Sequence, residues 1–300
     1  MVFKLYFYLY TLFGVMQFIS NSAPNYAQKI QQICLGLRPM NLSLEGKKAL
    51  VCGSSQGIGF AVAEQLALMG AHCTLFARNK TGLEEAVKRL DISLRQQHGI
   101  LVADFSDPAN VEEVVNTWAK ENSVHILVNN SGGPASGPIV NASSADFLAA
   151  FNQHLVCNHI ISLAVIEGMK KDNYGRIINI ISTSVKVPLK NLGVSNTIRG
   201  AVASWAKTMA NELGKFNITV NNVLPGATRT KRLTNIIEQS AKKSNLSDSD
   251  IEKEMIKEIP AGRFGEPEDI AALAAFLASP AASYINGTSI PVDGGRTGSI

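Results

Sequence analysis

The chain of 300 residues has few cysteines, little net charge, and no repeat or low-complexity linker. Its four cysteines make no Cys-x-x-Cys pair and no metal-ligand spacing, so we expect no metal site. The net charge of +4 comes without a basic stripe or a nucleic-acid-binding motif, which argues against DNA or RNA as a partner. Cys52 and Cys73 stand in apolar, strand-like runs. They are expected to be reduced core residues, as in a cytoplasmic protein.

Residues 1–39 contain no acidic residue but many aromatic ones, unlike the rest of the chain. Their apolar stretch VFKLYFYLYTLFGVMQFI is about long enough to span a bilayer. Three interpretations are open: translation begins at Met40, the leader anchors the protein in a membrane, or it is a signal peptide with a poor cleavage site. We favour a start at Met40, because MNLSLEGKKALVCG is a natural domain start. Membrane association is expected only if the leader is retained.

From residue 44 onward, short apolar runs alternate with amphipathic helical patterns. The runs at 47–53, 72–78, 99–105, 125–131, 175–182 and 218–226 are mostly near-continuous in apolar residues, as strands buried on both faces of a parallel sheet are. Alternation of strands and helices at this period implies right-handed crossovers. The sequence therefore predicts one α/β domain over residues 40–300: a single-domain Rossmann-type doubly wound parallel sheet with helices on both faces.

The segment 231–262 is a polar exception within this pattern. Ser249 and Glu252 have the spacing of a capping box, which predicts a short helix. Composition alone favours a solvated pair of helices. The position after the sixth strand favours a mobile lid, because ligands bind beyond the carboxyl ends of such strands.

Three glycines, Gly53, Gly57 and Gly59, stand between the first strand and the first long helix. Glycine allows a tight turn and lets the backbone approach a pyrophosphate, which the helix N-terminus then attracts. The second strand ends in LFARNK, where no acid is present to bind the ribose of NAD. Arg78 can meet a 2′-phosphate there instead, unless it is only a solvated charge at the strand end. We therefore favour NADP(H) over NAD(H) as the cofactor.

These motifs resemble the short-chain dehydrogenase/reductase family over essentially all of residues 42–295. NNSGG at 129–133 resembles the family's Asn-Asn-Ala-Gly, VDGG at 292–295 resembles its C-terminal strand, and GVSNTIRG looks closest to the 3-oxoacyl carrier-protein reductase-like branch. The resemblance implies that Asp104 contacts adenine and that Pro225, Gly226 and Thr230 hold the nicotinamide carboxamide. The full set of cofactor-binding residues that it implies is Gly53, Ser55, Gln56, Gly57, Ile58, Gly59, Arg78, Asp104, Asn129, Ser131, Gly132, Pro225, Gly226 and Thr230.

The catalytic positions of this family are altered here. In the family, a Ser orients the carbonyl, a Tyr donates a proton, a Lys lowers the pKa of the Tyr, and an Asn holds a relay water. Ser182 matches the Ser, but Ser195, Arg199 and His154 stand at the Tyr, Lys and Asn positions. A serine hydroxyl ionises far less readily than a phenol, an arginine stays charged, and a histidine titrates near neutrality.

The altered set predicts a different proton path. In this hypothesis Ser182 and Ser195 donate hydrogen bonds, Arg199 stabilises a developing oxyanion, and His154 relays a proton. The alternative for His154 is a packed helix residue, and the alternative for Ser195 is a slot left empty after activity was lost.

Two functions are compatible with these residues. The first is an NADP(H)-dependent oxidoreductase that reduces the carbonyl of a small molecule or a 3-oxoacyl thioester to an alcohol. The second is a catalytically inactive NAD(P)-binding homologue that acts as a sensor or partner subunit. The retained nicotinamide side favours the first, and the Ser-x-x-x-Arg pair favours the second. The family resemblance also implies a homo-oligomer, most often a tetramer.

Overall fold

The structure of the protein is a computed structural model that describes residues 40–298. The leader, residues 1–39, lies outside the described residues, so the choice among its three interpretations stays a prediction. From Leu42 onward the described chain belongs to one compact unit.

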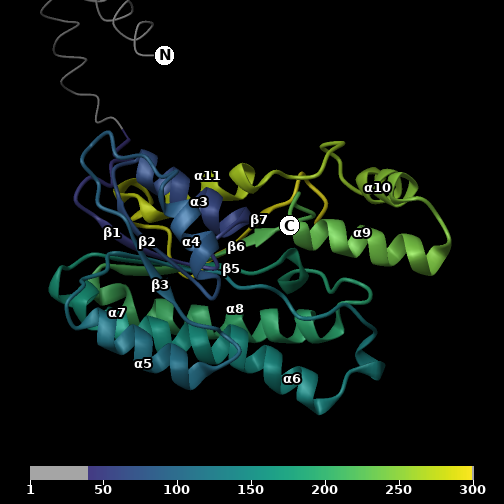
Figure 1. The fold of residues 1–300 in the computed structure, drawn as a ribbon, viewed down its shortest axis with the longest axis horizontal. Coiled ribbons are helices and arrows are strands. Elements are labelled where there is room, and N and C mark those ends of the chain that lie inside the picture. Colours follow the sequence, from purple (N-terminus) through teal and green to yellow (C-terminus); the bar gives the residue numbers. More distant parts are fainter. Residues whose placement is uncertain (1–39, 299–300) are drawn as a thin grey trace, which may run out of the picture. The chain divides into compact units, whose positions relative to one another are not determined.

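Seven parallel strands form one sheet in the order β3-β2-β1-β4-β5-β6-β7 (Figure 1). The order reverses between β1 and β4, which makes the topological switch point where doubly wound sheets bind ligands. This confirms the predicted fold class. The strands are β1 Lys48–Cys52, β2 His72–Ala77, β3 Gly99–Val102, β4 Ile126–Asn129, β5 Gly175–Ile180, β6 Ile218–Pro225 and β7 Ser289–Val292. The last strand ends where the VDGG motif begins, so the motif is the turn after the strand rather than the strand itself.

Helices cover both faces of the sheet (Figure 1). One face carries α3 (Gly57–Leu68), α4 (Lys80–Val87) and α11 (Pro267–Ala278), and the other carries α5 (Pro108–Ala119), α7 (Cys157–Lys171) and α8 (Gly193–Leu213). Each layer buries an apolar cluster against the sheet, as the sequence pattern predicts. Short one-turn helices lie at Ile139–Asn141, Thr183–Val185, Gly214–Phe216 and Pro280–Ala282.

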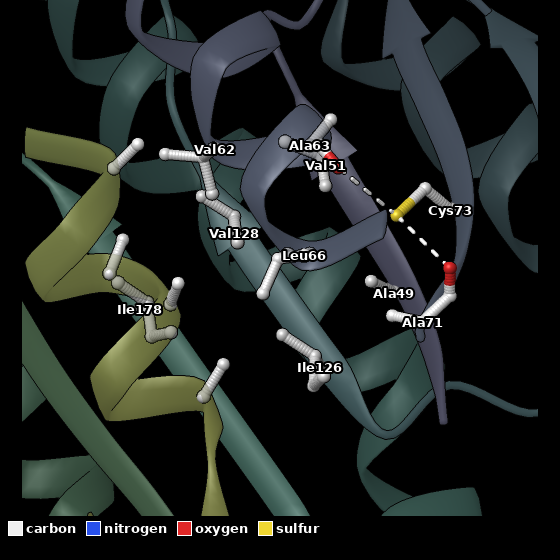
Figure 2. Close-up of a cluster of buried hydrophobic side chains, with 14 of the residues drawn as sticks. Ala49, Val51, Val62, Ala63, Leu66, Ala71, Cys73, Ile126, Val128 and Ile178 are labelled. Carbon is white, nitrogen blue, oxygen red and sulfur yellow. Dashed lines mark hydrogen bonds between the residues drawn. The ribbon is translucent and has the colours of Figure 1, made fainter. Parts of the chain in front are cut away.

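The core beneath α3 illustrates how the strands are buried (Figure 2). Val62 and Leu66 of α3 belong to the same buried cluster as Val128 and Ile178 of the sheet. Cys73 is a free, buried cysteine whose Sγ lies 3.5 Å from the Ala63 carbonyl oxygen. Burial raises the pKa of this thiol to about 12, so it stays protonated near neutrality. Cys52 is also free and buried, which confirms that both cysteines are core residues.

One helical run among the described residues, Ser144–Lys171, is long and apolar enough to cross a membrane by length and composition. It passes from α6 (Ser144–Phe151) through the π-helical turn η2 (Asn152–Val156) into α7. Ile161, Val165 and Met169 of α7 are buried in the cluster between the sheet and α5. The run is therefore explained as a core helix of the domain.

The polar segment 231–262 forms two helices, α9 (Lys231–Ser244) and α10 (Asp248–Lys257). The predicted capping box of Ser249 and Glu252 is wrong, because Ser249 already lies inside α10. The cap is Ser247, whose Oγ accepts a hydrogen bond from the Asp250 backbone N–H at 3.2 Å. SDSDIE (247–252) contains two overlapping residue pairs with the spacing of a capping box, and the helix begins at the earlier one. Whether the segment opens as a lid stays a prediction.

Candidate active site

A cleft of about 1500 Å³ lies along the carboxyl ends of β1, β4, β5 and β6. Its walls come from the loops after these strands and from α9. This is the edge at which open α/β sheets bind ligands. Most of the predicted site residues line it, namely Gly53, Ser55, Gln56, Gly57, Ile58, Arg78, Asp104, Ser131, Gly132, Ser182, Ser195, Arg199, Pro225, Gly226 and Thr230. Gly59, Asn129 and His154 are the predicted residues that do not line the cleft.

The glycine turn connects β1 to α3 in a geometry that needs glycine. Gly53 and Gly57 both have φ of +59°, in the left-handed region that other residues rarely adopt. A Cβ on Gly59 would collide with the Gly53 carbonyl oxygen, so the turn can pack this closely on α3 only because residue 59 has no side chain. The N-terminus of α3 begins at Gly57, and its unpaired N–H groups form a cradle for an anion. The residues present therefore fit a dinucleotide pyrophosphate.

Arg78 and Asp104 stand at one end of the cleft, after β2 and β3. Arg78 Nη1 lies 3.5 Å from Asp104 Oδ2, and the side chains are 76% and 45% exposed. An exposed pair of this kind contributes at most about 1 kcal/mol, so Arg78 can exchange it for a phosphate. The Ser106 backbone N–H donates to Asp104 Oδ1 at 3.0 Å and lowers the pKa of the Asp104 carboxyl.

Asn129 lies inside the sheet and is only 1% exposed. Its Nδ2 donates to Asn179 Oδ1 at 2.9 Å, and Asn179 Nδ2 donates to Asn222 Oδ1 at 2.9 Å. Asn222 Nδ2 completes this asparagine ladder by donating to Ser289 Oγ at 3.0 Å. The four residues are paired in register across β4, β5, β6 and β7. In contrast to the prediction, the Asn129 side chain braces the sheet rather than reaching into the cleft.

Ser182, Ser195 and Arg199 line the cleft together. Ser182 follows β5, and its Oγ accepts the Ser184 backbone N–H at 3.1 Å. Ser195 and Arg199 are one turn apart on α8 and are both buried. Arg199 Nη1 donates to the Ile180 carbonyl oxygen at 3.2 Å, two residues before Ser182. Burial, with the charge of Arg232, lowers the pKa of Arg199 to about 10, so the guanidinium stays charged at neutral pH.

His154 lies in the π-helical turn η2, behind Ser131, and is 1% exposed. Its Nδ1 lies 2.7 Å from Ser131 Oγ, and its buried Nε2 has no hydrogen-bond partner among the described residues. Burial lowers the pKa of His154 to about 2, helped by the charges of Arg199 and Arg232. The prediction that His154 titrates near neutrality is wrong, because the sequence shows neither its burial nor these two charges.

Pro225, Gly226 and Thr230 bring the end of β6 to the glycine turn. Gly226 packs so closely on Asp293 that a Cβ would lie 2.6 Å from that side chain. Thr230 caps α9 by accepting the Leu233 backbone N–H at 3.4 Å. Its methyl group would lie 3.6 Å from a Cβ on Gly57. The N-termini of α3 and α9 therefore meet across the cleft.

Two residues of the site were missed by the sequence reasoning. Asn130 Nδ2 donates to the Cys52 and Gly53 carbonyl oxygens at 3.3 and 3.2 Å, which fixes the glycine turn to the end of β4. Arg232, the second residue of α9, rests its guanidinium on Gly133 and donates from Nη2 to the Pro134 carbonyl oxygen at 3.2 Å. Asn130 was available as the second Asn of NNSGG, whereas nothing in the sequence distinguishes Arg232 from its solvated neighbours.

The family model described as enoyl-(acyl carrier protein) reductase matches residues 53–297. The chain belongs to the short-chain dehydrogenase/reductase family. It is 33% identical over 257 residues to the 3-oxoacyl-[acyl-carrier-protein] reductase of Vibrio cholerae, covering 85% of this chain and 98% of that one.

Two solved structures show the same fold. An L-sorbose reductase from Gluconobacter frateurii, complexed with NADPH and L-sorbose, has a TM-score of 0.81 and 29% identity, and covers 87% of this chain and 100% of that one. A gluconate 5-dehydrogenase from Burkholderia cenocepacia, in complex with NADP and tartrate, has a TM-score of 0.77 and 27% identity, and covers 87% of this chain and 99% of that one. As a short-chain dehydrogenase/reductase, the chain is an oxidoreductase by family.

The departure of this chain from its family is confined to side chains. α8 runs unbroken from Gly193 to Leu213, with the positions of the Tyr-x-x-x-Lys motif on its first two turns. No tyrosine, histidine or cysteine is among the described residues that line the cleft. Among the described residues lining the cleft, the family's Tyr and Lys positions hold Ser195 and Arg199, so neither offers a side chain that titrates near neutrality.

Proposed function

We propose that the protein is an NADP(H)-dependent reductase that converts a carbonyl compound into an alcohol by a non-standard proton path. The cofactor pyrophosphate binds at the glycine turn, where Gly53 and Gly57 adopt positive φ and the α3 N-terminus begins. Pro225, Gly226 and Thr230 hold the nicotinamide end. When bound, the reduced nicotinamide supplies the hydride to the carbonyl carbon.

The observation that carries the proposal is the position of Arg199. Its hydrogen bond to the Ile180 carbonyl oxygen ties a buried positive charge to the end of β5, beside Ser182. Ser182 and Ser195 donate hydrogen bonds to the carbonyl oxygen, and Arg199 stabilises the negative charge that develops on it. A charge fixed in a buried site before the reaction needs little reorganisation, which is why such groups are effective.

His154 takes part as a neutral imidazole. Because its pKa lies far below neutrality, it cannot deliver a proton as an imidazolium. Its contact with Ser131 Oγ orients that hydroxyl at the wall of the cleft. The alkoxide then takes its proton from water in the cleft, and the hydroxide left behind is reprotonated from solvent, so each turnover transfers one hydride and consumes one solvent proton.

We favour NADP(H) over NAD(H) for this protein. Arg78 directly follows β2 at the cleft and is largely exposed, so a 2′-phosphate can replace its weak pairing with Asp104. An Asp or Glu at this strand end would bind the ribose hydroxyls of NAD, and the strand has none.

A second candidate function is nucleotide binding without turnover. It is favoured by the shifted pKa of His154 and by the lack of a tyrosine among the described residues lining the cleft. Such a protein would keep the nucleotide affinity of its family and act as a sensor or partner subunit.

The deciding experiment is NADPH consumption over a panel of aldehydes, ketones, oxo acids and 3-oxoacyl thioesters. We expect measurable turnover with at least one class, and a loss of about a hundredfold or more in Arg199→Ala. The double variant Ser195→Tyr with Arg199→Lys restores the family pair. If turnover is seen only in the double variant, the natural chain binds nucleotide without reducing a carbonyl, and the second function holds.

We also propose a cytoplasmic homotetramer. The exposed apolar residues Leu148, Phe151 and Leu163 on α6 and α7 support a self-association surface. Light scattering at micromolar concentration tests this, and a monomeric mass contradicts it.

A chain beginning at Met40 tests the leader, because it should bind nucleotide as the full chain does.

A further inference from the structure

The residues lining the cleft carry an excess of positive charge. Its lining includes nine Lys or Arg residues and three acidic residues. Asp104 pairs with Arg78 and Glu258 pairs with Arg296, while Glu85 lies on α4. None of the three pairs with Arg199 or Arg232.

Arg199 and Arg232 come from separate elements, α8 and α9, line the same cleft, and lie close enough for the charge of Arg232 to lower the pKa of Arg199. Each donates one hydrogen bond to a main-chain carbonyl oxygen, that of Ile180 or of Pro134, at 3.2 Å. Burial lowers the pKa of both groups, and the charge of Arg232 lowers that of Arg199 further, with no carboxylate acting in the opposite direction. Two guanidinium groups that repel each other, with most of their N–H groups unused, form a site for an anion.

We propose that Arg232, together with Arg199, binds the carboxylate of a short oxo acid whose carbonyl lies against Ser182 and Ser195. This inference rests on the proposed reductase function and names its substrate class. Two guanidinium forks suit a planar carboxylate, and each can donate two parallel hydrogen bonds. The carboxylate neutralises the repulsion between the arginines and is unchanged by the reaction, which adds one hydride and one proton to the neighbouring carbonyl.

The position of the pair distinguishes a substrate anion from the cofactor phosphates. The pyrophosphate cradle is the glycine turn, and the 2′-phosphate site is Arg78, after β2. Arg232 instead rests on Gly133, which follows β4, and its charge reaches His154 behind Ser131. A thioester carries no anion beside its reacting carbonyl, so it would leave the pair uncompensated.

The test compares each oxo acid with its own methyl ester, with pyruvate and acetoacetate as the acids. We expect Arg232→Gln to raise KM for the acids by about tenfold or more, because a charge-assisted bidentate contact is lost. KM for the esters and for NADPH should stay unchanged. Lys242→Gln is the matched control: it removes one positive charge from the exposed face of the same helix, outside the cleft.

Equal preference for acid and ester in the natural chain would overturn the inference. So would an Arg232→Gln variant that weakens NADPH binding and leaves the acid-to-ester ratio unchanged. If no carbonyl compound is reduced, the proposed function fails, and calorimetric titration of pyruvate into the protein–NADP⁺ complex decides the inference separately. Binding that is lost in Arg232→Gln and kept in Lys242→Gln supports it, and no binding to the natural chain refutes it.

Discussion

The nucleotide end and the catalytic end of the cleft lie on the same sheet edge, yet different parts of the chain determine them. At the nucleotide end, the backbone sets the geometry: Gly53 and Gly57 adopt positive φ, and Gly59 leaves room for the turn. At the catalytic end, the side chains of Ser195 and Arg199 decide the chemistry on an ordinary helix. A helix accepts new side chains without changing its path, whereas the glycine turn accepts almost none. This difference explains how the family's fold is kept while its catalytic pair is replaced.

The largest effect that tests this difference is expected when the charge at the catalytic end is removed. Arg199→Ala should lower kcat by about a hundredfold or more, since loss of one fixed stabiliser costs ~2.7–4 kcal/mol. NADPH affinity, measured by fluorescence titration, should change much less. Lys207→Gln is the control, since it removes an exposed charge from the same helix. An unchanged kcat in Arg199→Ala would show that catalysis does not depend on the Arg199 side chain.

The matching change at the nucleotide end is Gly59→Ala. The added Cβ collides with the Gly53 carbonyl oxygen and with Asn130 Nδ2, so the turn must shift. We expect the free energy of unfolding to fall by about 1–3 kcal/mol and NADPH binding to weaken at least tenfold. Gly168→Ala in α7 is the control, because a Cβ there meets nothing within 4 Å. Normal NADPH binding by Gly59→Ala would contradict the backbone account.

His154, at the catalytic end, should make the free energy of unfolding depend on pH. Its pKa falls from 6.5 to about 2 on folding, so the unfolded chain binds a proton below pH 6.5 that the folded chain does not. Stability from this source is complete above pH 6.5 and is lost as pH falls, by up to ~1.4 kcal/mol per pH unit. Compared with His154→Asn, the natural chain should lose about 2 kcal/mol more between about pH 7 and pH 5, by urea unfolding. A difference that does not vary with pH would show that the pKa of His154 does not fall on folding.

The smallest expected effect is at Arg78. Arg78→Ala should remove most of the preference for NADPH over NADH, a factor of roughly tenfold, because one charge-assisted phosphate contact is lost. Lys80→Ala is the control, since Lys80 pairs with Glu84 on the exposed side of α4. Equal binding of both nucleotides by the natural chain would refute the assignment of Arg78.

The sequence predicted the fold well because its signals are local. Apolar runs mark all six strands that were proposed, and glycines mark the turn between β1 and α3. The cap of α10 was misplaced by two residues because SDSDIE holds two boxes of equal quality. The prediction that Asn129 contacts the cofactor failed for a different reason. NNSGG contains two asparagines, and only the folded sheet shows that Asn130, not Asn129, lines the cleft.

The chemistry of the site was harder to predict, because it depends on contacts between distant segments. Ser195 and Arg199 were found because their spacing matches the Tyr-x-x-x-Lys motif of the family that the sequence resembles. The pKa of His154 could not be found that way, since it is set by burial and by the charges of Arg199 and Arg232. Arg232 comes from a polar segment whose composition indicates only solvent exposure, and its place on Gly133 appears only once α9 is folded over the cleft.

The asparagine ladder has a consequence for how the strands find their alignment. Strands with apolar residues on both faces bury equally well when shifted along one another, so hydrophobicity alone cannot choose among the alignments. Amides buried in the sheet in the carboxyl-terminal halves of β4, β5 and β6 can choose, because a shift would break their hydrogen bonds and leave amide groups without partners at about 1–3 kcal/mol each. The hydrogen bonds of Asn129, Asn179 and Asn222 thus favour a single register of the three strands. That register also places the loops at the strand ends, which form the two ends of the cleft.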